Sequence, residues 1–347
     1  MTPLLILTLL LGSAGWLLLG RAKPMAQGAS QNVSADQLSL IIPARNEEQN
    51  LPRLLRSIAA QSLRPTEIIV VNDASSDRTA AIARECGAVV LDSRPLPEGW
   101  RGKTWACHQG QLAAKGALLL FADADTWFEP GGLARVLSLF HDGAWSVAPF
   151  HAVRNPYESL SLFFNLNMTM GTVPNGLFGQ MLLVDRASYR RAGGHEAVKG
   201  RTLENFFLAQ QFRAAGIPTR SLIGRGSFAC RMYPNGLREL IDGWTKGFAS
   251  GATQTPRPVL LMLVGWMTGL MLGPAGWLMT SDHARWGPVY LLGAVQVGWL
   301  SRRIGSFGWI PALLYPLPLV FFFAVFVRSA LRSGRQVTWK GRQIRAD

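Results

Sequence analysis

The sequence predicts an α/β protein in which a mostly parallel β-sheet, covered by helices, is joined to apolar helices at both ends of the chain. Three observations predict this. Short apolar runs alternate with segments of helical periodicity between residues 37 and 235. Long uncharged stretches flank that region on both sides. Charged residues make up only 16% of the 347 residues, below the roughly 25% of soluble domains. This composition argues against an ordinary cytosolic protein.

The first apolar stretch, residues 4–20, carries no charge. As a helix it would be about 26 Å long, close to the roughly 30 Å of hydrocarbon in a bilayer. A secretory signal peptide has basic residues before its apolar run and a cleavage site after it. Here the basic residues, Arg21 and Lys23, follow the run. We therefore predict a retained anchor over residues 1–23 and, by the positive-inside rule, a cytoplasmic domain after it.

Four short apolar runs then predict strands, at residues 38–42, 68–71, 88–91 and 118–122. Apolar residues recur at helical spacing over 51–58, after the first strand. A second helix, ending near residue 85, follows the second strand with Ser76 or Asp77 at its start. Such alternation is typical of a parallel sheet, in which ligands bind beyond the carboxyl ends of the strands.

Carboxylates follow three of these strands: Glu47 the first, Asp73 the second, and Asp123 with Asp125 the fourth. Alternation along an extended chain would put Asp123 and Asp125 on one side and Ala124 on the other. Two like charges so close need a cation nearby. Hard oxygen ligands on a turn suit Mg²⁺ or Mn²⁺, with a substrate diphosphate completing the shell. The alternative is structural, an Asx-turn or a cap for the following helix.

The sequence contains neither GxxxxGK[ST] nor GxGxxG, the usual phosphate-binding loops. Cations and a metal would therefore have to hold a nucleotide. Arg101 and Lys103 are the candidates, because they lie on a glycine-flanked segment just before the Asp123 strand. The alternative is a solvated loop over two buried tryptophans. His195, which follows two glycines, is either a third metal ligand or a structural residue.

The C-terminal part has two uncharged runs of 21 residues, 259–279 and 307–327, which are long enough to span a membrane. The run between them, 288–300, has 13 residues and suits a re-entrant or interfacial piece. That arrangement, which we predict, returns the basic tail to the cytoplasmic side. If 288–300 crosses instead, the tail ends outside, against the positive-inside bias.

The formal net charge of +14 indicates adhesion to membrane lipids, since no nucleic-acid-binding motif accompanies it. The three cysteines lack CxxC spacing and indicate reduced thiols.

Two further segments of the middle region are apolar. Residues 157–172, with Glu158 as their only charge, predict either an interfacial helix or lid or a core helix. Residues 237–249 predict an amphipathic helix at the membrane surface.

Three motifs together resemble those of family 2 glycosyltransferases of GT-A fold: PARNEE at 43–48, NDASSD at 72–77 and DAD at 123–125. Residues 99–107, 231–233, 243–246 and 339–343 are similar to the glycosyltransferases of carotenoid biosynthesis that act on a carotenoid carboxylate. The resemblance implies a Rossmann-like GT-A domain and a UDP-sugar donor, UDP-glucose.

The resemblance also implies roles for individual residues. Glu47 and Asp73 match positions that contact the nucleoside, and Lys103, with Arg101, matches a cation near the nucleotide. Asp123 would lie by the ribose and the metal. Asp125 would ligate the Mg²⁺ or Mn²⁺ that neutralises the UDP leaving group. The matched C-terminal segments would place the acceptor near Arg231, Trp244 and Lys246.

At the expected catalytic base the resembling family has Glu-Asp, where this chain has Glu204-Asn205. Asn cannot accept a proton. A carboxylate acceptor is already ionised at pH 7, whereas a hydroxyl loses its proton during attack. We therefore expect inverting transfer to a carotenoid carboxylate, with Glu204 and Asp125 as catalytic residues. Two alternatives stay open: Glu204 as base for a hydroxyl of a hopanoid or polyprenyl lipid, and a catalytically weak scaffold that binds nucleotide sugars.

The expected organisation places the protein in a bacterial cell membrane with its catalytic domain in the cytoplasm. Its parts are an anchor (1–23), a GT-A catalytic domain (37–235), an interfacial amphipathic helix (236–256), membrane segments (257–330) and a basic tail (331–347).

Overall fold

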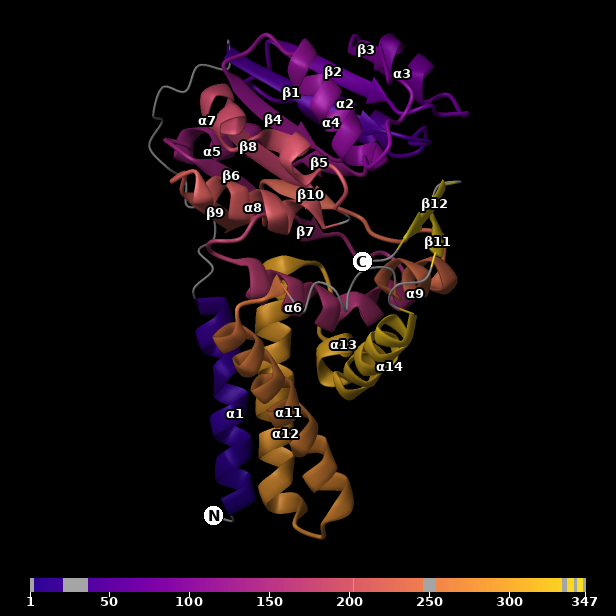
Figure 1. The fold of residues 1–347 in the computed structure, drawn as a ribbon. Coiled ribbons are helices and arrows are strands. Elements are labelled where there is room, and N and C mark those ends of the chain that lie inside the picture. The colour runs from indigo at the N-terminus through magenta and orange to yellow at the C-terminus, as the bar shows by residue number, and fades with distance from the viewer. Residues whose placement is uncertain are drawn as a thin grey trace.

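The computed structural model describes residues 3–20, 37–201, 203–245, 254–332, 336–339 and 342–345. Figure 1 shows a globular α/β part above a stalk of long helices, with the N-terminus at the free end of the stalk. The stalk contains α1 (Pro3–Gly20), α11 (Arg257–Met279) and α12 (His283–Ile304).

The globular part is built on a seven-stranded sheet of order β3-β2-β1-β4-β8-β6-β9. Strands β3, β2, β1 and β4 are parallel, β8 is antiparallel to both of its neighbours, and β6 and β9 are parallel. The predicted α/β class and mostly parallel sheet are confirmed. The bounds are β1 (Leu38–Ala44), β2 (Glu67–Asn72), β3 (Val89–Asp92), β4 (Leu118–Ala122), β6 (Ala144–Ala148), β8 (Met181–Asp185) and β9 (Thr219–Ile223).

Helices cover both faces of this sheet because successive strand residues face opposite sides. In β1, Leu40 and Ile42 lie in one core cluster, with α2 and α5, while Ile41 lies in the other, with α4 and α8. Helix α4 approaches closely at Gly110, where a Cβ atom would lie 2.4 Å from Ile41. The helices are α2 (Leu51–Ala59), α3 (Thr79–Glu85), α4 (Gly102–Ala113), α5 (Gly132–Leu139), α7 (Arg186–Arg191) and α8 (Glu204–Ala214).

A second, small sheet of order β5-β10-β7 connects the globular part to the stalk. It consists of β5 (Thr126–Phe128), β10 (Phe228–Cys230) and β7 (Phe150–His151). The backbone carbonyl of His151 accepts a hydrogen bond of 2.9 Å from the N–H of Ser306, just beyond α12. The end of α12 is thereby attached to the globular part.

Between the two parts lies a layer formed by η2 (Pro156–Ser161), α6 (Leu162–Thr172), α9 (Leu237–Thr245) and α14 (Pro316–Arg332). Two interpretations of residues 157–172 were open, and the structure shows a buried core helix: Phe163 and Phe164 are both 0% exposed. Phe163 packs against Trp266 of α11, and Phe164 stacks on Trp244 of α9 at 4.6 Å. Of the predicted amphipathic helix at 237–249, residues 237–245 form α9, and residues 246–249 lie outside the described residues.

The helices of the C-terminal part differ from the prediction in two ways. Residues 288–300 are not a short separate piece, because α12 extends beyond this apolar run at both ends and has 22 residues. Residues 307–327 are not one helix. They form α13 (Ile310–Leu313) and the 17-residue α14, because Pro316 interrupts the chain between them.

Among the described helices, α1 and α11 are long and apolar enough to cross a membrane. Figure 1 shows α12 running back along α11 toward the globular part, and α14 lying near α9 and α6 rather than in the lower stalk. A hairpin of β11 (Gln336–Trp339) and β12 (Arg342–Arg345) follows α14.

Candidate functional site

The loops after β1 and β2 interlock at one edge of the sheet. The N–H of Asn46 donates to Ser75 Oγ at 3.1 Å, and the N–H of Ser76 donates to Asn46 Oδ1 at 2.9 Å. Asn46 has φ 52°, in the left-handed region that Asn tolerates better than most residues. The N–H of Glu47 donates to Thr79 Oγ1 at 2.8 Å. Each loop therefore fixes the backbone of the other.

Glu47 and Asp73, the residues assigned to the nucleoside, lie in these two loops. The carboxylate of Glu47 accepts a hydrogen bond of 2.9 Å from Asn50 Nδ2. Asp73 is only 7% exposed, and its N–H donates to the carbonyl of Ala44 at 2.8 Å. Asp77, expected near the start of the next helix, accepts the N–H of Thr79 at 3.0 Å.

Asp123 and Asp125 lie on the turn from β4 to β5. The carbonyl of Asp123 accepts hydrogen bonds from the hydroxyl and the N–H of Thr126, at 2.7 and 3.2 Å. Ala124 is 2% exposed, Asp123 is half-buried and Asp125 is exposed. The turn therefore directs its two carboxylates away from the core and leaves Asp125 accessible to a ligand.

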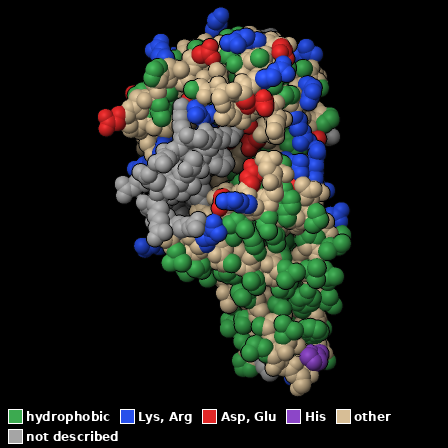
Figure 2. Space-filling view, turned by 90° about the vertical axis from the view of Figure 1, so that its right-hand side faces the viewer, with side chains coloured by type: hydrophobic (Ala, Val, Ile, Leu, Met, Phe, Trp, Pro, Cys, Tyr) green, Lys and Arg blue, Asp and Glu red, His purple; other side chains and the backbone are tan. Residues whose placement is uncertain are grey.

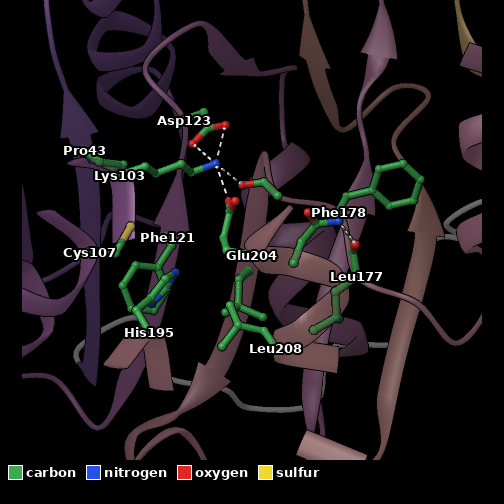
Figure 3. A pocket seen from close by; sticks show the side chains of 13 residues that line it. Pro43, Lys103, Cys107, Phe121, Asp123, Leu177, Phe178, His195, Glu204 and Leu208 are labelled. Atoms are coloured by element: carbon green, nitrogen blue, oxygen red, sulfur yellow. Dashed lines mark hydrogen bonds and ion pairs between the residues drawn. The ribbon is translucent and has the colours of Figure 1, made fainter. Parts of the chain in front are cut away.

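Lys103 links Asp123 to Glu204 (Figure 3). Its Nζ lies 2.8 and 2.9 Å from the two carboxylate oxygens of Asp123, 2.9 Å from Glu204 Oε1 and 3.0 Å from the carbonyl oxygen of Gly179. Burial lowers the pKa of Lys103, but the charges of Asp123 and Glu204 raise it by more, so the net pKa lies well above its ordinary value. Three partners match the three hydrogens of a charged ammonium group.

Glu204 begins α8 and is 7% exposed. Gly179 makes room for it, since a Cβ atom at this glycine would lie 3.1 Å from Glu204 Oε1. The neighbouring Asn205 donates its side-chain N–H to the carbonyl of Leu177 at 2.6 Å. Glu204 is therefore the acidic residue that α8 contributes to the pocket, while the Asn205 amide is held by the backbone.

Below Lys103 the pocket is largely apolar: Figure 3 shows Cys107, Phe121, His195 and Leu208 beneath the three charged groups. His195 is buried, and this burial, with the charges of Lys103 and His108, lowers its pKa to about 3.

The imidazole of His195 is held by Tyr189. The Tyr189 hydroxyl accepts the backbone N–H of His195 at 2.9 Å and lies 2.7 Å from Nδ1. Among the described residues, no three His, Cys, Asp or Glu side chains are grouped so that they could hold a metal ion. A role for His195 as a third metal ligand stays a prediction.

The other predicted site residues do not line this pocket, and one of them lies outside the described residues. Arg101 lies at the N-terminal boundary of α4 and donates from Nε to the carbonyl of Gly200 at 3.3 Å. Arg231 forms an ion pair with Glu158, with Nη2 2.6 Å from Oε1. Trp244 is 5% exposed and donates to Ser161 Oγ at 2.9 Å, so its ring belongs to the core between the two parts. Lys246 lies outside the described residues.

Sequence reasoning missed Gly179 as a residue of the site and Glu158 as the partner of Arg231. Glu158 had one available signal: it is the only charge in an otherwise apolar segment, and a buried charge needs a partner. Gly179 had none, because its role depends on how close α8 comes to the chain.

Comparison with known proteins identifies the family. The model of glycosyl transferase family 2 matches residues 39–173. The chain is 32% identical over 335 residues to the 4,4'-diaponeurosporenoate glycosyltransferase of Staphylococcus aureus strain MRSA252, an alignment that covers 90% of this chain and 89% of that protein. The same protein from strain USA300 matches with the same identity and coverage.

Among solved structures, the mannosyltransferase PcManGT from Pyrobaculum calidifontis, in complex with GDP-Man and Mn²⁺, is similar with a TM-score of 0.55. The alignment covers 95% of this chain and 98% of that one, at 18% identity. Because the identity is so low, this similarity supports the fold alone. Together with the strand-end carboxylates, the sequence relatives show that the chain belongs to glycosyltransferase family 2.

Proposed function

We propose that this protein transfers glucose from UDP-glucose to the carboxyl group of a carotenoid acid, with inversion at the anomeric carbon. The observation that carries the proposal is the 32% identity, over 90% of the chain, with an enzyme named for the carboxylate diaponeurosporenoate. The site is compatible with it, because the acidic and basic residues expected to bind a nucleotide sugar gather at one edge of the sheet, where such folds bind ligands.

Asp125 and Asp123 are the proposed metal ligands. They suit Mg²⁺ or Mn²⁺, because both offer carboxylate oxygens from one turn and Asp125 is exposed. Two protein carboxylates leave the rest of the shell to the diphosphate oxygens and water, as is usual for ions shared with a phosphorylated substrate. When bound, such an ion supplies positive charge that stabilises the departing UDP.

For the rest of the donor we propose Glu47 and Asp73 at the nucleoside and Arg101 near the phosphates. Lys103 acts on the donor through Asp123, which it holds in place. It also fixes Oε1 of Glu204, which leaves Oε2 for the acceptor.

Transfer to a carboxylate needs no base. A carboxylate oxygen of the acceptor attacks the anomeric carbon on the face opposite the diphosphate. The bond from that carbon to the phosphate oxygen breaks, and UDP leaves with the electron pair. The product is a sugar ester, and no proton is transferred.

The position of Glu204 in the pocket favours a second candidate, transfer to a hydroxyl of a hopanoid or polyprenyl lipid, with Glu204 taking the hydroxyl proton.

We propose that α1, α11 and α12 cross the membrane of a bacterial cell, with the globular part in the cytoplasm. Figure 2 shows hydrophobic side chains covering the lower stalk, with Lys and Arg side chains above it. Near the globular part, Arg302 lies over the ring of Trp309 and Arg303 over that of Trp299. Arginine and tryptophan together are typical of the membrane interface, and the excess of basic residues marks its cytoplasmic side.

The test uses purified protein with labelled UDP-glucose and paired acceptors, a carotenoid acid and the matching alcohol. We expect an ester that mild alkali cleaves, and a rate that Glu204→Gln lowers by no more than about tenfold. An alkali-stable glycoside formed only by the wild type would contradict this, because loss of a general base costs roughly 10²–10⁴-fold. Protein that binds UDP with Mn²⁺ but turns over neither acceptor would instead be a scaffold.

A further inference from the structure

The short helix η2 holds the segment that follows β10, residues 231–244, through three of its side chains. The Tyr157 hydroxyl donates to the carbonyl of Tyr233 and accepts the N–H of Gly236, both at 3.0 Å. One turn later, Ser161 accepts the indole N–H of Trp244 at 2.9 Å. Tyr233 has φ 57°, a conformation that a bulky residue adopts only where its surroundings impose it. The segment is therefore fixed by η2 over most of its length.

The third side chain is Glu158, which holds Arg231. Glu158 Oε1 accepts from both Nη2 and Nε of Arg231, at 2.6 and 3.1 Å. It also accepts from Asn155 Nδ2 at 3.2 Å, while Oε2 accepts the backbone N–H of Arg154 at 2.8 Å. The Glu158 side chain is 4% exposed, so each of its oxygens has a donor where water cannot reach.

The strand register places Arg231 beside Asp125. In the β5–β10 pair, Cys230 is opposite Thr126, and the chains run antiparallel. Arg231 and Asp125 are the next residues beyond this last pair, at the same end of the two strands, so the chain at Arg231 lies close to the turn that carries Asp125. The charge of Asp125 also contributes to the raised pKa of Tyr233, after burial, which agrees with a position near this segment.

Arg231 differs from its partner in accessibility. Its side chain is 22% exposed, whereas Glu158 is buried. Two of its five N–H donors point to Glu158, and among the described residues it has no other partner. The pair therefore presents a fixed and partly exposed guanidinium group close to a proposed metal ligand.

We propose that Glu158 is a positioning residue that holds Arg231 beside Asp125. Glu158 and Arg231 together form an oxyanion-binding subsite of the transferase site. The ligand is an oxyanion of the reactants, either the diphosphate of the donor or the carboxylate of the acceptor. The inference rests on the proposed function, since it requires that the reactants bind at Asp125. Because η2 runs directly into α6, which packs on α11, the helices of the stalk set the position of Arg231.

The experiment compares Glu158→Gln, Arg231→Gln and the double variant in the full-length protein, purified in lipid nanodiscs. Two quantities are measured: the Kd of UDP with Mn²⁺, and the KM of a carotenoid acid with labelled UDP-glucose. We expect each single variant to raise one of these at least tenfold. An increase in Kd assigns the subsite to the diphosphate, and an increase in KM assigns it to the acceptor carboxylate. We expect the Kd or KM of the double variant to be no higher than that of Arg231→Gln, because Glu158 acts through Arg231.

The matched control is Glu85→Gln, which removes one partner of the exposed Arg78–Glu85 pair and should leave both quantities within twofold of the wild type. Arg231→Lys keeps the buried carboxylate paired but loses the two-N–H contact, so it should lose binding even if Glu158→Gln does not fold. Wild-type values in Glu158→Gln or in Arg231→Lys would overturn the inference, as would additive losses in the double variant. Wild-type protein that binds no UDP would overturn the proposed function first.

Discussion

At the scale of single residues, the site is organised by charge. Lys103 is shared between two carboxylates, Asp123, which we propose for the donor, and Glu204, which we propose for the acceptor. Asp125 stands outside this arrangement and is exposed. The two members of the DAD motif therefore have different surroundings: one is held by an ammonium group, and the other is accessible to an ion.

The exposure of Asp125 leads to a prediction about metal binding. Asp125→Asn keeps the shape of the side chain and loses its charge, so Mn²⁺-dependent UDP binding and sugar transfer should both fall at least a hundredfold. The Tm should stay within a few degrees of the wild type, because an exposed side chain adds little to the core. Calorimetric titration with UDP, in the presence and absence of Mn²⁺, measures the first effect. Binding that stays metal-dependent and of wild-type strength would exclude Asp125 as a ligand.

Part of this site could be predicted from the sequence, and the reason is geometric. The carboxyl ends of parallel strands meet at one edge, so Glu47, Asp73 and Asp123 follow from recognising three strands. Contacts between Lys103 and Gly179, or Arg231 and Glu158, join segments more than 70 residues apart. Local patterns carry no information about such pairs, since tertiary packing alone brings them together.

At the scale of elements, the length of an apolar run in the sequence did not predict the length of the helix that contains it. The run at 288–300 suggested a short piece, yet α12 continues through His283 and Arg285 at one end and Arg302 and Arg303 at the other. In the membrane that we propose for α12, a helix can extend beyond its apolar core because long Arg side chains reach the interface. The run at 307–327 suggested one helix, but Pro316 divides it.

The contacts of Gln296 lead to a prediction about how α1 is held. This residue of α12 is 3% exposed; its amide oxygen accepts from Trp266 of α11 and its amide nitrogen donates to the carbonyl of Gly12 of α1, both at 2.9 Å. Gln296→Leu removes both bonds and leaves the Trp266 N–H unpaired in apolar surroundings. We expect a loss of about 1–2 kcal/mol in the free energy of unfolding, measured by titration from mild detergent into SDS.

The control for this prediction is Thr268→Val. The Thr268 hydroxyl is exposed on α11 and bonds only to its own helix, to the carbonyl of Val264. Thr268→Val should change the free energy of unfolding by less than half as much as Gln296→Leu does. An equal effect of the two substitutions would mean that Gln296 does not hold α1 to the other helices.

At the scale of the whole molecule, the route of the chain through the stalk determines which segments would reach the cytoplasm in the topology we propose. The arrangement expected from the sequence and the one in the structure both return the tail to the side of the catalytic part. They differ in which helix makes the return. In the structure it is α12, since Ser306 at its end is bonded to the backbone of His151 in the globular part. In the expected arrangement it is 307–327, and Ser306 lies on the outer side.

Labelling with a membrane-impermeant maleimide in intact bacterial cells distinguishes these routes. Cys86 is exposed on the globular part and should react only after lysis. Ser281→Cys, in the exposed turn between α11 and α12, should react in intact cells. Ser306→Cys should behave like Cys86, because α12 brings this residue back to the globular part. Labelling of Ser306→Cys in intact cells would restore 307–327 as the returning span. Labelling of Cys86 in intact cells would place the catalytic part outside, where the cytoplasmic UDP-glucose pool could not supply it.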